Sequence, residues 1–192
     1  MAIIYLVRHG ETELNAGGLL RGRLDPPLNA TGRREAEAVA RALRWVQPAV
    51  IVSSPLQRAV DTASAISAEC GVEVETDPRL IDRDYGRFAG QAREEVERRF
   101  GSLEEAPGVE PSSEVLARAG AALDDTAGRL GEGAGVVVAH DVVNRLLLAA
   151  FDRARFDDPE AVPQRTGGYN ILHRWGTRWI VGSVDLHPAT GG

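Results

Sequence analysis

The sequence predicts an α/β protein built around one mainly parallel sheet. Short apolar runs alternate along the chain with segments whose apolar side chains recur at helical spacing. The runs are apolar at every position, which is typical of parallel strands that are buried on both faces. The 192 residues, 43% hydrophobic and 26% charged, have the composition of an ordinary globular protein, so we expect a single domain over 1–192.

The first elements follow from the apolar pattern and from the loop and capping residues that interrupt it. A strand is expected over 3–7, and a long polar loop rich in glycine and proline comes after it. Loops of this length are usually functional. Thr31 can cap a helix whose apolar positions run from Ala36 to Val46, and the next strand is expected over 50–52.

The same alternation continues after the second strand. Ser54 and Pro55 supply a capping residue and a proline at the first helical position, which predicts a helix that runs to Cys70. Arg58 would lie in the first turn of that helix. A short strand over 72–75 follows.

The rest of the chain repeats the pattern. The remaining elements are expected to be a short helix over 91–100, a longer helix marked by apolar residues over 116–130, a central strand over 135–139, a helix over 142–151, and two closing strands over 169–172 and 179–184. The glycine-rich stretch 131–135 precedes a strand instead of following one, so we interpret it as a turn and not as a phosphate-binding loop.

Composition excludes several classes of protein. A net charge of −6 argues against binding to nucleic acid, because affinity for a polyanion comes mainly from clustered basic residues. No stretch approaches the roughly 20 apolar residues of a membrane span, and the N-terminus lacks the pattern of a signal peptide. The single cysteine, Cys70, has no neighbours at metal-ligand spacing. We therefore expect a cytoplasmic protein without metal or cofactor, and a homodimer stays open.

Two histidines carry the strongest functional signal. His9 and His140 each come directly after an apolar run, so both are expected at strand exits on one edge of the sheet. Ligands bind at that edge in open α/β sheets. Arg8 precedes the first histidine, and Arg58 lies just past another strand exit. Two imidazoles and two guanidinium groups in one crevice indicate phosphate chemistry.

The motifs around these residues resemble the histidine phosphatase superfamily, which includes the cofactor-dependent phosphoglycerate mutases. The matching segments are Leu6-Val7-Arg8-His9-Gly10-Glu11-Thr12 with Asn15, then Asp25-Pro26-Pro27-Leu28 with Thr31-Gly32, then Ser53-Ser54-Pro55-Leu56-Gln57-Arg58-Ala59, and His140. They occur in order over nearly the whole chain. The resemblance implies a three-layer α/β/α sandwich of the phosphoglycerate mutase type and a phosphohistidine intermediate.

The chemistry of the side chains gives each residue a role. Imidazole offers an uncharged nitrogen near neutral pH, so His9 is the expected nucleophile. Arg8 and Arg58 would bind the phosphoryl oxygens, which suit planar guanidinium groups. His140, protonated by its neighbours and by the bound anion, would hold an equatorial oxygen in the transition state. Asn15 would add neutral donors.

The proton donor for the leaving group has two candidates. In the family this donor is usually a glutamate in the pattern L-x-E-x-x-x-G, and here Asp82 stands at that position, one methylene shorter. Asp141 follows His140, and in the acid phosphatase branch such a His-Asp pair supplies the acid. We rank Asp82 first, because the motif around it is otherwise intact.

The substrate side is expected to include Arg21 and Gly22 on the long first loop, Tyr85, and Arg93 within an otherwise solvated charged helix.

Mutases of this family hold their substrate with basic residues in an insertion, whereas 102–113 here contains none. A metal-independent phosphatase for a small phosphorylated metabolite is therefore the preferred function. Mutase-type phosphoryl transfer, a protein phosphatase and a non-catalytic phosphate-binding module remain alternatives.

Overall fold

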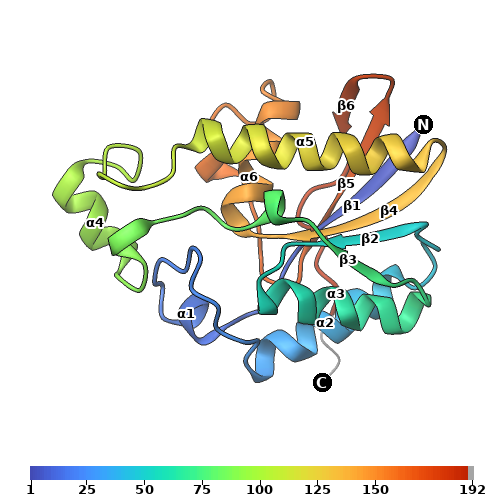
Figure 1. Cartoon of the computed structure of the whole chain (residues 1–192), viewed down its shortest axis with the longest axis horizontal. Helices are drawn as coiled ribbons and strands as arrows, with labels where there is room; N and C mark the ends of the chain where they lie inside the picture. The colour runs from blue at the N-terminus through green and yellow to red at the C-terminus, as the bar shows by residue number, and fades with distance from the viewer. Residues whose placement is uncertain (190–192) are drawn as a thin grey trace.

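The computed structural model describes residues 1–189, and a six-stranded sheet forms its centre (Figure 1). The strands are β1 (Ala2–Arg8), β2 (Val50–Ser53), β3 (Val74–Thr76), β4 (Gly133–Ala139), β5 (Tyr169–Trp175) and β6 (Arg178–Val181). Their order across the sheet is β3-β2-β4-β1-β5-β6. The first four in this order are parallel, and β5 and β6 add an antiparallel hairpin beside β1. The prediction of a mainly parallel sheet is confirmed.

Helices cover both faces of the sheet. The α-helices are α1 (Glu13–Ala16), α2 (Ala30–Leu43), α3 (Gln57–Cys70), α4 (Arg93–Phe100), α5 (Ser112–Leu130) and α6 (Asp141–Phe151). In Figure 1, α5 and α6 lie above the sheet, and α2 and α3 lie below it. This is the three-layer sandwich that the resemblance implied. None of the helices within residues 1–189 has the length and apolar composition that a membrane crossing needs.

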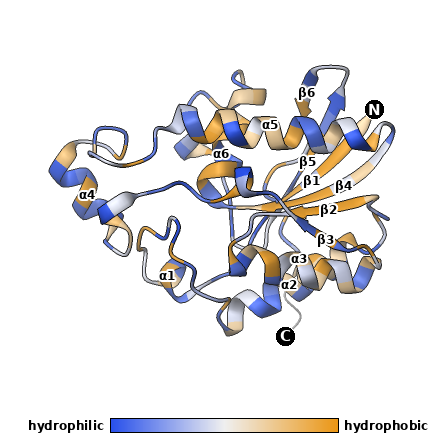
Figure 2. Cartoon of the chain, in the orientation of Figure 1, coloured by the Kyte–Doolittle hydropathy of each residue, from blue (hydrophilic) through white to orange (hydrophobic). Residues whose placement is uncertain are grey.

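Alternate side chains of the central strands point to the two helical layers. Leu6 of β1 packs in one buried cluster with residues of α5 and α6, whereas Val7 packs in another with residues of α2 and α3. The strands are accordingly apolar in Figure 2, while the helices show polar outer faces. Removal of this apolar surface from water is the main force that holds the three layers together.

A third apolar cluster lies beyond the sheet and organises the region around α4. Its buried members are Leu20, Tyr85, Phe88, Val96, Leu103 and Ala106. Figure 1 shows α4 standing apart from the three layers, at the end of the molecule where α1 also lies. The cluster therefore packs the long first loop, the segment after β3 and α4 into one small unit.

Three predicted helix starts differ from those of the structure, since α4 begins at Arg93 and not at Gln91, and the starts of α2 and α3 are also wrong. The cap of α2 is Asn29, whose Oδ1 accepts the Gly32 N–H at 2.8 Å, and Thr31 lies inside the first turn. The helix α3 begins at Gln57, after Ser54 and Pro55. The Ser54 hydroxyl lies 2.7 Å from Nε2 of His140 and also accepts from the Leu56 N–H at 3.4 Å, ahead of the helix, whose cap residue is Leu56.

Strand and loop boundaries also differ from those predicted. The strand β3 starts two residues later than expected, β5 extends to Trp175, and β6 ends at Val181. The strand β4 starts at Gly133, so the glycine-rich stretch is a turn only at its beginning, where Gly131 has a φ of 58°. The polar first loop contains α1, which Thr12 caps.

Candidate active site

The two histidines meet at the edge of the sheet where β1 and β4 end. These strands are parallel neighbours, and their register pairs Arg8 with Ala139. His9 and His140 come next on each strand, and their ring centroids are 5.1 Å apart. The expectation that both imidazoles share one edge is confirmed.

His9 presents an uncharged ring nitrogen to Arg58. Its Nδ1 lies 2.7 Å from the carbonyl oxygen of Gly10, and a carbonyl only accepts, so Nδ1 carries the proton. Nε2 then holds the lone pair and accepts from Nε of Arg58 at 3.2 Å. Burial lowers the pKa of His9 well below its usual value, and the Arg58 charge lowers it further. The ring is therefore neutral near pH 7.

The turn that carries His9 is held from α2 and α3. The Gly10 N–H donates to Oγ1 of Thr62 at 3.1 Å, and that hydroxyl donates to the Arg58 carbonyl at 2.8 Å. A Cβ on Gly10 would lie 2.3 Å from the Gly32 carbonyl oxygen. The Glu11 N–H donates to Glu35 at 2.8 Å. The close approach at Gly10 excludes any larger side chain there.

Arg58 is completely buried and makes four directed contacts. Besides His9, it donates to the carbonyl oxygens of Leu24 at 2.7 Å and Gly22 at 2.9 Å. Its Nη2 also donates to Oδ2 of Asp82 at 3.0 Å. Gly22, predicted on the substrate side, therefore also helps to orient this guanidinium group through its carbonyl.

His140 is fixed at one nitrogen and has no partner at the other. Its Nε2 lies 2.7 Å from the Ser54 hydroxyl, whereas Nδ1 has no hydrogen-bond partner among residues 1–189 and lies 3.8 Å from Asp82. Burial lowers its pKa well below the usual value, followed by the charge of Arg58. The nearby guanidinium groups thus favour the neutral ring when no anion is bound, and protonation of His140 by a bound phosphate remains a prediction.

Arg8 approaches the same centre from the end of β1. It donates to the carbonyl oxygen of Gln164 and lies 3.4 Å from Asp141. Burial lowers its pKa, and the Asp141 charge opposes this shift. The Gln164 side chain bonds to Asn144 at 3.1 Å and to Asn170 at 2.8 Å, so a buried amide network supports the residue that holds Arg8.

The structure brings both candidate carboxylates to the centre, in different surroundings. The Asp82 side chain is 2% exposed and lies between Arg58 and His140. The Asp141 side chain is 19% exposed and pairs with Arg145 at 2.7 Å as well as with Arg8. Asp82 is thus inside the cluster of basic residues, and Asp141 is at its rim.

Asn15 serves a local purpose in this structure. Its Oδ1 accepts from the Thr12 N–H at 3.0 Å and the Thr12 hydroxyl at 2.8 Å, which closes the cap of α1. The oxygen is therefore used by the backbone turn, and a role for the Asn15 amide nitrogen toward phosphate remains a prediction.

Three other predicted residues line a small cavity beside the centre. Arg21, Tyr85 and Arg93 surround about 180 Å³ together with Asp141. The Nε of Arg21 is buried and has no hydrogen-bond partner among residues 1–189. Burial raises the pKa of Tyr85, so its hydroxyl stays protonated.

A search for metal ligands gives no candidate site. Within residues 1–189, no group of three or more His, Cys, Asp or Glu side chains is arranged to hold a metal ion.

The comparison with protein families decides the identity of this site. The model of the histidine phosphatase superfamily (branch 1) matches residues 4–186. The chain belongs to this superfamily.

Curated members of the family are similar to this chain over part of its length. The glucosyl-3-phosphoglycerate phosphatase of Mycolicibacterium vanbaalenii is 43% identical over 94 residues, which are 49% of this chain and 42% of that protein. The "probable phosphoglycerate mutase GpmB" of Proteus mirabilis is 44% identical over 86 residues, 45% of this chain and 40% of that protein. Each curated match thus spans less than half the length of the relative.

A solved histidine phosphatase is similar over nearly the whole chain. The mycobacterial glucosyl-3-phosphoglycerate phosphatase in complex with VO3 superposes with a TM-score of 0.86 at 27% identity. The superposition covers 96% of this chain and 98% of that one. The fold and the order of the strands that carry the histidines are those of the family.

Sequence reasoning missed several residues that orient the site. Ser54 was expected to cap a helix; it lies ahead of α3, and its contact with His140 was not anticipated. Thr62 and Gln164 were not singled out, although they hold Gly10 and Arg8. Thr62 lies four residues after Arg58, one helical turn away, which is a signal that could have found it. Gln164 lies in a loop, and no spacing in the sequence indicates its position.

Proposed function

We propose that this protein hydrolyses phosphate monoesters of small metabolites through a phosphohistidine formed on His9. The observation that carries the proposal is the neutral Nε2 of His9, which faces Arg58 and lies beside a second buried imidazole. The relatives named as phosphatases of small phosphorylated compounds support the same chemistry.

In the first step the phosphoryl group is bound by Arg8, Arg58 and His140. With Ser54 donating to Nε2 of His140, the Nδ1–H is free to donate to a phosphoryl oxygen. The lone pair of His9 Nε2 attacks phosphorus, a P–N bond forms, and the P–O bond of the ester breaks. The leaving oxygen takes a proton from Asp82, with Asp141 as the alternative donor.

In the second step water is the acceptor. It attacks phosphorus, its proton passes to the carboxylate that acted first, and inorganic phosphate leaves with the P–N bond electrons returned to His9. Hydrolysis is favoured over mutase-type transfer because 102–113 contains no basic residue to retain a bisphosphorylated intermediate. Arg93, the basic residue nearest to that role, is bound by two glutamates.

The test is the turnover of an aryl phosphate by the His9→Ala variant. We expect loss of at least about 10³-fold in kcat, because the variant lacks the nitrogen that forms the phosphohistidine. Circular dichroism should show the fold unchanged, and His173→Ala, on β5 outside the site, should keep its activity. Retained turnover by His9→Ala would contradict the proposal. Inhibition by a chelator would reveal a metal that the mechanism does not include.

The other expectations from the sequence belong to this proposal. They are a single domain over 1–192, a cytoplasmic location, and a small phosphorylated substrate as the ligand instead of nucleic acid or a membrane, with a homodimer still open. The net charge of −6 supports the exclusion of nucleic acid.

A further inference from the structure

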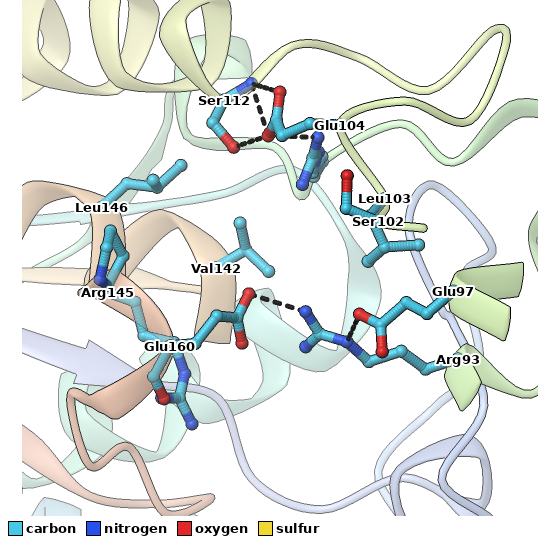
Figure 3. Close-up of a pocket in the computed structure, with 12 residues that line it drawn as sticks. Arg93, Glu97, Ser102, Leu103, Glu104, Ser112, Val142, Arg145, Leu146 and Glu160 are labelled. Carbon is cyan, nitrogen blue, oxygen red and sulfur yellow. Dashed lines mark hydrogen bonds and ion pairs between the residues drawn. The ribbon is translucent and has the colours of Figure 1, made fainter. Parts of the chain in front are cut away.

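A larger cavity lies beyond the small one that borders the reaction centre. It measures about 340 Å³, within the range of roughly 300–1,000 Å³ that small-molecule sites occupy. Figure 3 shows it between α6 on one side and α4 with the following loop on the other. The lining residues used below are Arg83, Arg93, Ser102, Val142, Arg145 and Glu160. We call this space the distal cavity.

The distal cavity borders the small cavity that lies beside the reaction centre. Arg93 and Val142 line both the distal cavity and the small cavity. Asp141 lines the small cavity and lies 3.4 Å from Arg8 in the centre. A phosphate ester held at His9 would therefore direct its leaving group past Asp141 and toward the distal cavity.

The guanidinium group of Arg93 is already neutralised. Its Nε donates to Glu97 at 2.7 Å, and its Nη2 donates to Glu160 at 2.6 Å. Figure 3 shows Arg93 reaching across the cavity to Glu160, so the pair joins α4 to the segment that follows α6. An anion that approached Arg93 would be repelled by these two carboxylates.

The other two arginines of the distal cavity are also paired. Arg83 donates to Glu104 at 2.7 Å, and Arg145 donates to Asp141 at 2.7 Å. Arg145 also donates to the Glu160 carbonyl oxygen at 2.6 Å. The cavity thus contains three arginines, each with a carboxylate partner, and offers no unpaired cation to a second anionic group.

The surfaces between these ion pairs are mainly apolar. Val142 and Leu146 of α6 form one wall, Leu103 lies beside Ser102 across the cavity (Figure 3), and Pro159 is also part of the lining. The hydroxyls of Ser102 and Ser112 are the neutral polar groups of the lining. Such a surface suits carbon groups and hydroxyls, because burying an unpaired charge against it is costly.

We propose that the distal cavity binds the uncharged end of the leaving group, so that the preferred substrates carry an apolar or hydroxyl-bearing group there instead of a second anion. This inference rests on the proposed function. It concerns the end of the leaving group that is far from the phosphate; a charge next to the ester would lie near Arg21 instead.

The test compares three aryl phosphates on the wild-type protein. Phenyl phosphate reaches only the small cavity, 2-naphthyl phosphate extends further, and 6-carboxy-2-naphthyl phosphate adds a carboxylate at the far end. We expect kcat/KM for the naphthyl ester to exceed that for each of the other two by roughly 10-fold or more. Equal values for the three esters, or a preference for the carboxylated one, would overturn the inference.

A filling variant locates the effect. Ser102→Trp places a large side chain in the distal cavity and should lower kcat/KM for the naphthyl ester roughly 10-fold more than for phenyl phosphate. Ser64→Trp, on the exposed face of α3, is the matched control and should leave the ratio of the two esters unchanged. An equal loss for both esters in Ser102→Trp would contradict the assignment of the cavity.

A charge variant tests the ion pairs without changing volume. Glu160→Gln removes one of the two carboxylates on Arg93 and should raise kcat/KM for the carboxylated ester several-fold. Glu69→Gln, which removes an exposed charge at the end of α3, is the control and should leave kcat/KM for the carboxylated ester unchanged. No gain in Glu160→Gln would show that the arginines do not decide the charge preference.

Failure of the proposed function would look different. In that case the wild-type protein would turn over none of the three esters, phenyl phosphate included. Calorimetry would then measure the Kd of each ester for the protein. The distal cavity predicts the lowest Kd for 2-naphthyl phosphate, and higher values for phenyl phosphate and for the carboxylated ester.

Discussion

Arg58 connects more parts of the reaction centre than any other side chain described here. One guanidinium group contacts the nucleophile candidate His9, the carboxylate of Asp82 and two loop carbonyls. Burial lowers the pKa of both histidines, and the Arg58 charge lowers each of them further. The charge expected to bind phosphate thus also helps to keep the attacking nitrogen free of a proton.

The two carboxylates differ enough in position for mutation to separate them. Asp82→Asn should lower kcat on an alkyl phosphate by about 10²–10⁴-fold, because a poor leaving group depends on a positioned acid. The loss on p-nitrophenyl phosphate should be much smaller, since that leaving group needs little protonation. Asp141→Asn is the matched comparison and should cost less on the alkyl ester. The measurement is steady-state kinetics on both esters.

A larger loss of kcat on the alkyl ester in Asp141→Asn than in Asp82→Asn would identify Asp141 as the proton donor. Equal losses on alkyl and aryl esters in both variants would mean that neither carboxylate protonates the leaving group and that each acts only on binding.

At the scale of elements, α5 holds the segment that carries Asp82. Arg118 of α5 donates to the carbonyl oxygens of Arg79 at 2.8 Å, Ile81 at 2.5 Å and Asp82 at 3.2 Å. It also pairs with Glu110 at 2.8 Å, and Glu110 accepts from the Asp84 N–H at 2.9 Å. One side chain therefore fastens an irregular segment to a helix.

Removal of the Arg118 hydrogen bonds should impair proton transfer from Asp82 more than it impairs phosphate binding. Arg118→Ala should lower kcat on an alkyl phosphate by roughly 10-fold or more, with a smaller loss on p-nitrophenyl phosphate. Arg129→Ala is the control, because Arg129 lies on the same helix and pairs with exposed Glu75. A uniform loss on both esters would indicate a purely structural role for Arg118.

The elements also show where sequence patterns suffice. The apolar periodicity predicted each of the six strands and the five longer helices, because burial of a face depends on local spacing. The start of α3 could not be predicted from Ser54 and Pro55, since the cap residue is Leu56, which makes no side-chain cap hydrogen bond. Asn29 and Thr31 are both good caps, and only the backbone geometry decides between them.

The whole molecule buries two histidines at the edge of its sheet, and this couples stability to pH. Folding lowers the pKa of His9 and His140 below their usual 6.5. As the pH falls below 6.5, the unfolded chain binds protons on these residues and the folded protein does not, so the free energy of unfolding decreases. The free energy of unfolding therefore keeps its full value above pH 6.5, as far as these two histidines determine it, and decreases as the pH falls below 6.5.

Urea unfolding in phosphate-free buffer at pH 6.5 and 5.5 measures this coupling. Each histidine should lower the free energy of unfolding by up to about 1 kcal/mol over that unit of pH. His140→Gln should reduce the decrease, whereas His173→Gln should retain it because both site histidines remain. Inorganic phosphate should reduce the decrease in the wild-type protein by binding the folded state. An unchanged pH dependence in His140→Gln would contradict the assignment.

Sequence alone determined the α/β class, the parallel strands and the pairing of His9 with His140 at one edge, because each depends on local apolar runs and on the geometry of parallel strands. Only the tertiary structure decided that burial lowers the pKa of His140, that Arg93 is bound by two glutamates and that Asp82 lies between Arg58 and His140. Charge states and ion pairs depend on which side chains from distant segments share a buried space, and no spacing along one chain specifies that.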